Sequence, residues 1–181
     1  MKQLICHCLF WVLCSNFANA DQRDPRLNDL FRSMSQTSQA RASAEIEQKI
    51  WQIWLQHQNP KIEARLRQGM LAMAQNPSRA LRVFTALIED EPDFAEAWNK
   101  RATLYYLLGD YSASAQDIER TLALEPRHFG ALSGLGLVHL ALDQYLEAQD
   151  AFEAVLEIQP YSRNAQQNLE RINLYLRRFT T

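Results

Sequence analysis

Three prolines, Pro92, Pro126 and Pro160, recur every 34 residues, and the segments that they close have similar patterns of apolar and small residues. A fixed period of this length indicates stacked helix–turn–helix units, each of which needs its neighbours to bury its apolar face. The period therefore predicts an all-α chain. It also favours a protein that presents a surface over one that holds reactive groups.

The clearest unit ends at Pro126. Trp98, Ala102 and Tyr105 are spaced four and three residues apart, as on one face of a helix, and Gly109-Asp110 breaks that helix. A second apolar face follows and stops at the proline, which cannot continue a helix. The same sequence of events is repeated 34 residues later.

This arrangement resembles the tetratricopeptide repeat, whose pattern is W-x2-L-G-x2-Y, then A-x3-F, then P. Ala148-x3-Phe152 and Ala80-x3-Phe84 match the second part of the pattern, and Leu135-Gly136 matches the first. We assign a degenerate repeat to residues 61–94 and two better repeats to 95–128 and 129–162. The resemblance implies a superhelical array of antiparallel helix pairs with a concave binding groove.

The segments that flank the repeats are also predicted to be helical. Residues 21–60 form an N-terminal helical extension with a polar linker, and its helix at about 40–57 carries Trp51 and Trp54 on an amphipathic face. We expect this helix to pack on the first repeat. Residues 161–181 have no second half-repeat and are predicted to form a solvating capping helix.

The first 20 residues have the features of a secretory signal peptide. Lys2 precedes an apolar run, and Ala18-Asn19-Ala20 fits a small-x-small cleavage site. An uncleaved hydrophobic N-terminus is the alternative. The run is too short for a stable membrane anchor. All three cysteines fall within it, so cleavage leaves a chain without thiols, and repeats behind such a signal favour a bacterial periplasmic protein.

Composition and motifs give no sign of catalysis. Removal of Lys2 leaves 18 basic against 21 acidic residues, a formal charge of −3, which argues against nucleic-acid binding. His57, His128 and His139 share no metal-ligand spacing, and no phosphate loop or nucleophile motif is present. We therefore predict no enzyme activity, no cofactor and no metal. The sequence leaves the oligomeric state open.

The resemblance implies that the first helix of each repeat lines the groove. We predict that the partner meets these residues: Arg65, Asn99, Lys100, Thr103, Tyr106, Ser133, Leu137, Asn168 and Arg171. In some family members Lys, Asn and Arg hold a peptide's terminal carboxylate there. Gly69, Gly130 and Gly134 replace expected polar groups, so no known clamp is predicted, and an ordinary hydrated concave face is the alternative.

The leading functional hypothesis is a non-enzymatic adaptor in the bacterial periplasm that binds a peptide or partner helix in the groove. The alternative is a structural or assembly subunit of an envelope complex, with the Trp51/Trp54 helix as its interface. A stable stoichiometric partner would favour the subunit, and several weak peptide-like partners would favour the adaptor.

Overall fold

The computed structural model describes residues 21–178, and these residues form nine helices and no strand. The helices are α1 (Arg26–Gln36), α2 (Ala40–Trp54), α3 (Pro60–Ala72), α4 (Pro77–Asp90), α5 (Ala95–Leu107), α6 (Tyr111–Leu124), α7 (Phe129–Ala141), α8 (Tyr145–Ile158) and α9 (Arg163–Arg177). The all-α prediction is confirmed. The predicted signal peptide lies outside the described residues.

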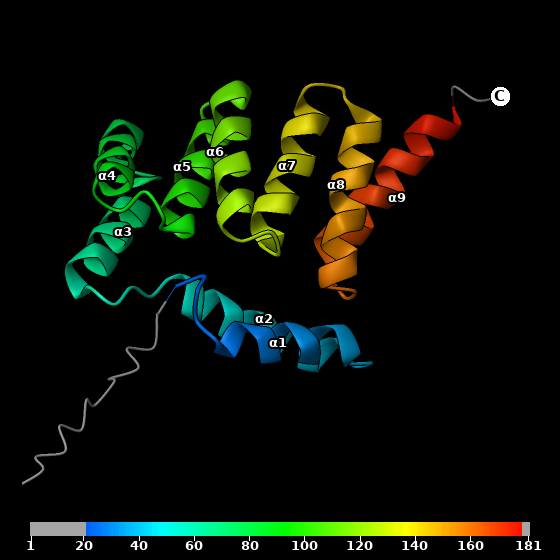
Figure 1. Cartoon of the computed structure of the whole chain (residues 1–181). Coiled ribbons are helices and arrows are strands. Elements are labelled where there is room, and N and C mark those ends of the chain that lie inside the picture. The colour runs from blue at the N-terminus through cyan, green and yellow to red at the C-terminus, as the bar shows by residue number, and fades with distance from the viewer. Residues whose placement is uncertain (1–20, 179–181) are drawn as a thin grey trace, which may run out of the picture.

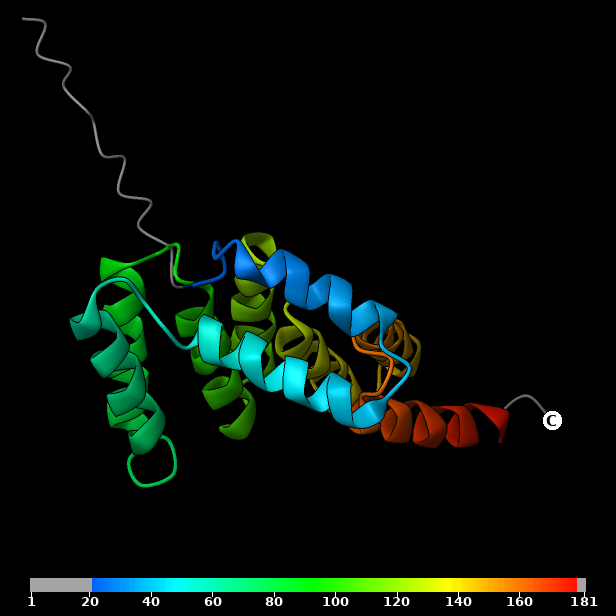
Figure 2. The ribbon, with the colours of Figure 1, turned by 90° about the horizontal axis from the view of Figure 1, so that it is seen from below.

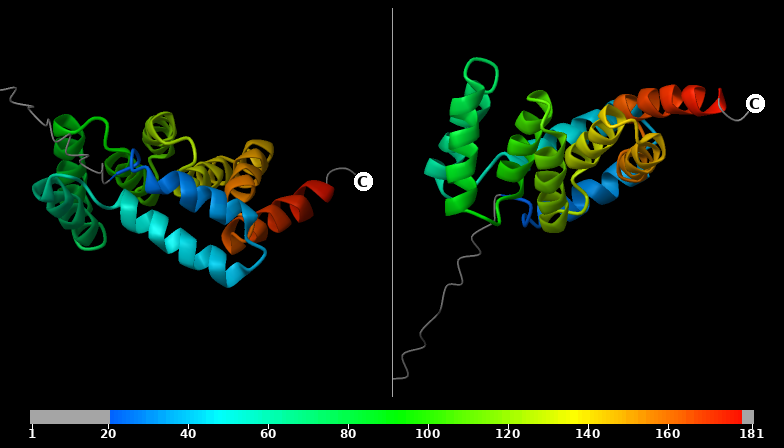
Figure 3. Two further views of the ribbon diagram at one scale, coloured as in Figure 1. Left: turned by 60° about the horizontal axis from the view of Figure 1, so that its bottom comes forward. Right: turned by 90° about the horizontal axis from the view of Figure 1, so that it is seen from above.

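The helices from α3 onward form a row of antiparallel pairs (Figure 1). The pairs are α3–α4, α5–α6 and α7–α8, and α9 packs on α8 at the end of the row. Successive pairs meet through α4 on α5 and α6 on α7. Views from other directions show that the row is twisted, so that α3–α4 is turned relative to α7–α8 (Figure 3).

Short polar residues begin these helices, as the sequence pattern requires. The side chains of Asn59, Asn76, Asp110 and Ser162 each accept a hydrogen bond from a backbone N–H in the first turn of the helix that follows. Such N-caps satisfy donors that the helix itself cannot pair. The 34-residue prolines lie just after α4, α6 and α8, where they open the turns between pairs.

Close contacts within the pairs reveal a shift of register in the first pair. A Cβ atom on Gly136 would lie 2.7 Å from the Phe152 ring, and one on Gly69 would lie 2.4 Å from the Phe84 ring, so the two glycines occupy equivalent positions. Gly136 precedes Phe152 by 16 residues, whereas Gly69 precedes Phe84 by 15. The connection in the first pair is therefore one residue shorter, and α3 is displaced by one residue from the 34-residue phase.

The N-terminal helices α1 and α2 form a hairpin that lies across one end of α5–α9 (Figures 1 and 2). Leu27, Met34, Ile50 and Trp54 of this hairpin share one apolar core with residues of α7, α8 and α9. The expectation that α2 packs on the first repeat is therefore wrong. The hairpin instead covers the second half of the array, where Phe129 meets Trp54 with ring centroids 4.9 Å apart.

Hydrogen bonds fasten the hairpin segment to all three turns between pairs. The Gln22 side chain donates to the carbonyl of Asp93. Arg127 donates to Asn28 at 2.9 Å, and Gln159 donates to Glu47 at 2.5 Å. The hairpin thus fixes the spacing of successive pairs in addition to burying apolar surface.

The predicted alternative interface on α2 is used inside the chain. Trp54 is only 1% exposed, and Trp51 is half-buried with its ring edge against Phe129, at a centroid separation of 5.4 Å. These two tryptophans are therefore not available as an outer assembly surface. Within residues 21–178, no helix is both long enough and apolar enough to cross a membrane.

Candidate functional site

A buried carboxylate lies where the hairpin meets the repeats. Glu96, in the first turn of α5, is 1% exposed. Its Oε1 lies 2.7 Å from Lys100 Nζ, and its Oε2 lies 3.0 Å from His128 Nε2 and accepts a hydrogen bond from the Asn99 amide at 3.1 Å. Three side chains therefore converge on one anion.

The surroundings keep Glu96 ionised. Burial raises its pKa, but the Lys100 charge and the hydrogen bond with His128 outweigh burial and hold the pKa below the ordinary value of 4.5. His128 Nδ1 accepts from the N–H of Ala131 at 3.1 Å, which leaves Nε2 as the protonated nitrogen that donates to Glu96. Trp54 stacks on the His128 ring at 4.0 Å, so this polar centre holds the hairpin in place.

Several residues predicted to face a partner instead contact the protein itself. Asn99 and Lys100 are bound to Glu96, and Lys100 lies under the Trp51 ring, 5.0 Å from its centroid. Arg65 pairs with Asp90 of α4 at 2.5 Å, because the one-residue shift of α3 turns it away from the groove. Asn168 is buried and donates to Asn164. Arg171 is exposed on α9, outside the hollow described next.

The remaining predicted residues surround one hollow in the groove between α5 and α7. The hollow has a volume of about 150 Å³. Its lining includes five residues of the predicted groove: Asn99, Thr103, Tyr106, Ser133 and Leu137. Small residues form its floor, namely Ala102, Ser114, Gly130 and Gly134, with Ile118 beneath them. The 34-residue phase places these residues together because it holds within the second and third pairs.

The chain fills the adjoining part of the groove with its own side chain. A Cβ atom on Gly130 would lie 2.5 Å from Cη2 of Trp51, so the tryptophan ring occupies the space that a side chain would need there. Sequence reasoning missed this contact, although a glycine at a position where the family pattern expects a polar residue was a visible signal. It also missed the Glu96–Lys100 pair, which has the i, i+4 spacing of helical ion pairs.

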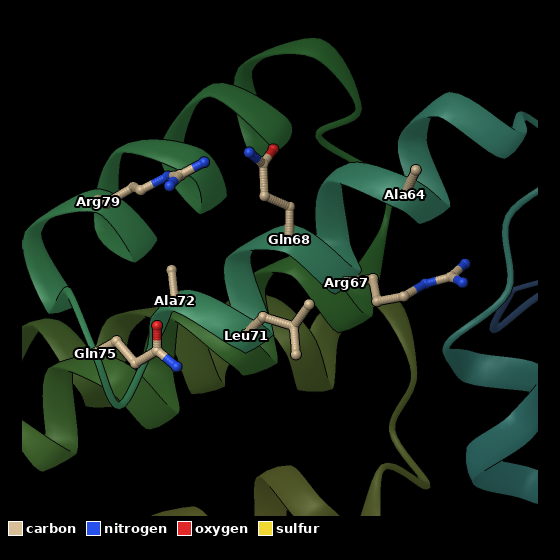
Figure 4. Close-up of a pocket in the computed structure, with 7 residues that line it drawn as sticks. All are labelled: Ala64, Arg67, Gln68, Leu71, Ala72, Gln75 and Arg79. Carbon is tan, nitrogen blue, oxygen red and sulfur yellow. The ribbon is translucent and has the colours of Figure 1, made fainter.

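Two other hollows lie on the first pair. One, of about 420 Å³, is on the outer face of α3 and α4, and Figure 4 shows Arg67, Gln68, Leu71 and Arg79 around it. Leu71 there is 72% exposed. The other, of about 270 Å³, is lined by Leu55, Glu63, Leu66, Arg67 and Met70. The register shift brings Arg67 and Met70 to this side in place of the predicted Arg65.

Among the described residues, no group of three or more His, Cys, Asp or Glu side chains is arranged to hold a metal ion. The polar centre around Glu96 is closed by the hairpin, and its donors are all engaged with the carboxylate. The groove hollow is the feature of this face that a partner can reach.

Comparison with known proteins agrees with the repeat pattern. The tetratricopeptide repeat profile matches residues 66–118 and 100–163. A TPR repeat-containing protein of Rhizobium etli is 34% identical over 146 residues, which cover 80% of this chain and 71% of that protein. The bovine SGT1 homolog is 33% identical over 78 residues, 43% of this chain and 23% of that protein.

Solved structures share the fold. The first TPR of Spaghetti (RPAP3), bound to the HSP90 peptide SRMEEVD, has a TM-score of 0.62 and 24% identity, covering 65% of this chain and 94% of that chain. The Sgt2 TPR domain of Aspergillus fumigatus also has a TM-score of 0.62, with 24% identity over 67% of this chain and 83% of that chain. With the repeat pattern, the helix pairs and the close Gly–Phe crossings in view, this chain belongs to the tetratricopeptide repeat family.

Proposed function

We propose that this protein is a non-enzymatic interaction scaffold of the bacterial periplasm that binds a peptide or a partner helix in its concave groove. The observation that carries the proposal is the hollow between α5 and α7, which five residues of the predicted groove surround. A TPR domain of the same fold that holds a peptide supports the class of function. Concave sites of this kind orient a ligand with a few polar groups on a mainly apolar lining.

The groove residues divide into an exposed edge and an apolar wall. Thr103 is exposed on α5, and Tyr106 is half-buried one turn further along, with its ring against Tyr111 at 5.6 Å. Leu137 approaches from α7. A bound segment would contact both helices and would therefore sense the spacing of the second and third pairs, which the hairpin fixes.

A double variant tests the groove. Thr103→Ala with Tyr106→Ala removes a hydroxyl and an aromatic wall, and we expect at least about tenfold weaker capture of partners from periplasmic extract, about 1.4 kcal/mol. The matched control is Gln116→Ala with Glu119→Ala, two exposed positions on α6. Circular dichroism should show the same helix content and melting curve for both variants. A folded groove variant that captures the wild-type partners at wild-type level would refute the proposal.

The periplasmic assignment depends on export. The described fold begins at Asp21, whose carboxylate pairs with Arg23, so cleavage after Ala20 leaves every helix from α1 to α9 in the mature chain. Mass spectrometry of the protein from its native host should find Asp21 as the first residue. Intact residues 1–20 in a cytoplasmic fraction would sink this part of the proposal.

A further inference from the structure

We infer that the groove recognises a bulky apolar side chain of its partner, Leu or Phe, inserted into the hollow between α5 and α7, and that it does not require a free C-terminal carboxylate. This inference rests on the proposed function, because it specifies the chemistry of the same groove. Three observations support it: the charges around the groove, the size of the hollow, and the state of its polar groups.

The cation beside the hollow is already neutralised. Lys100 is 2.7 Å from the buried Glu96 carboxylate, its side chain is only 17% exposed, and Trp51 lies over it. Arg65, the other predicted cation on this side, pairs with Asp90. A carboxylate entering the hollow would lose its water without meeting an uncompensated positive charge there, and that loss is unfavourable.

The hollow has the size of one large apolar group. Its volume is about 150 Å³, and an apolar cavity of roughly 150 Å³ accommodates a benzene ring. Gly134 leaves the space open, since the nearest side-chain atom to a Cβ built there is Ile118 Cδ1 at 3.5 Å. Tyr106 and Leu137 then form walls around a floor of small residues.

The polar groups at the edge of the hollow are satisfied by the protein. The Asn99 amide donates to Glu96, and the Thr103 hydroxyl donates to the Asn99 carbonyl at 2.9 Å. Beyond Tyr106, Leu107 is 65% exposed and extends the apolar surface to the rim. The occupant that fits is therefore an internal segment of another protein, uncharged at the point of insertion, with one Leu or Phe as its anchor.

An NMR titration of the wild-type protein tests the inference directly. The probes are N-acetyl-phenylalaninamide, N-acetyl-leucinamide and the acidic peptide SRMEEVD with a free or an amidated C-terminus. We expect saturable shifts at Tyr106, Ser133 and Leu137 with the two apolar amides. We expect no loss of groove binding when the peptide is amidated. Groove binding by the free peptide that disappears on amidation, with no response to the apolar amides, would overturn the inference.

A variant that fills the hollow gives an independent test. Gly134→Leu projects an apolar side chain into the space, and it should weaken both the amide probes and partner capture at least about tenfold, whereas Gly134→Ala should keep most of both. If Gly134→Leu is folded and captures the partner at wild-type level while the Thr103/Tyr106 double variant does not, the anchor inference fails and the proposed groove function stands. If neither variant affects capture, the proposed function itself fails.

Discussion

At the scale of single residues, two glycines one half-turn apart in α7 are predicted to respond oppositely to the same substitution. Gly136→Ala places a Cβ 2.7 Å from the Phe152 ring and should lower the unfolding free energy by about 1–3 kcal/mol, as in overpacked cores. Gly134→Ala meets open space in a helix interior and should raise it by up to about 1 kcal/mol. Urea unfolding followed by circular dichroism measures both. Equal shifts of the midpoint would contradict the assigned crossing of α7 and α8.

The buried Glu96 predicts a pH dependence with a definite sign. Its pKa in the folded protein lies below 4.5, so its ionised form stabilises the fold above that pH, and the contribution disappears as the pH falls through the folded pKa. Glu96→Gln should cost about 3–5 kcal/mol near neutral pH, the usual effect of breaking a buried pair. The difference from wild type should shrink below pH 4.5.

Unfolding measured at pH 7 and at pH 3.5 would test this, with the exposed Glu119→Gln as a control that should differ little from wild type at either pH. A cost for Glu96→Gln that is the same at both pH values would mean that the carboxylate charge does not support the fold.

At the scale of helices, α2 is predicted to be an anchor of the whole fold. Trp54→Ala removes a fully buried indole that packs on His128 and Phe129, and it should cost about 3–5 kcal/mol of unfolding free energy. Leu71→Ala, at a 72% exposed position of α3, should cost less than about 0.5 kcal/mol. If Trp54→Ala cost under 1 kcal/mol, the packing of the hairpin on the array would be disproved.

The helices themselves could be predicted from the sequence because their signals are local. The 34-residue prolines, the Asn and Asp caps and the apolar spacing act within one or two turns of the chain, and the array follows from repeating them. Thr103, Tyr106, Ser133 and Leu137 surround one hollow for the same reason.

The contacts that the sequence did not reveal are distant or depend on a single omitted residue. Glu96 meets His128 across 32 residues, and nothing local marks that pairing. Arg65 turned toward Asp90 because one connection is shorter by a residue, which rotates a helix by more than a quarter turn. The site of the hairpin follows from shape complementarity between Trp51 and Gly130, which periodicity does not encode.

At the scale of the whole molecule, we predict one cooperative unfolding transition. An unfastened repeat array can lose its end units separately, but here the hairpin spans the second and third pairs and α9. Far-ultraviolet circular dichroism and tryptophan fluorescence should therefore give the same urea midpoint. Trp98→Phe leaves Trp51 and Trp54 as the mature chain's reporters of the hairpin. A fluorescence transition at lower urea in that variant would show that the hairpin detaches first.

The ties between the hairpin and the turns also set the order in which the protein can be completed. Gln22 waits for Asp93, Asn28 for Arg127, and Glu47 for Gln159, separations of 71, 99 and 112 residues. A chain is made from its N-terminus, at roughly 5–20 residues per second, and long-range contacts slow folding. The hairpin is therefore the first part to be synthesised and the last to find its place, and its tryptophans remain uncovered until nearly the entire chain has emerged.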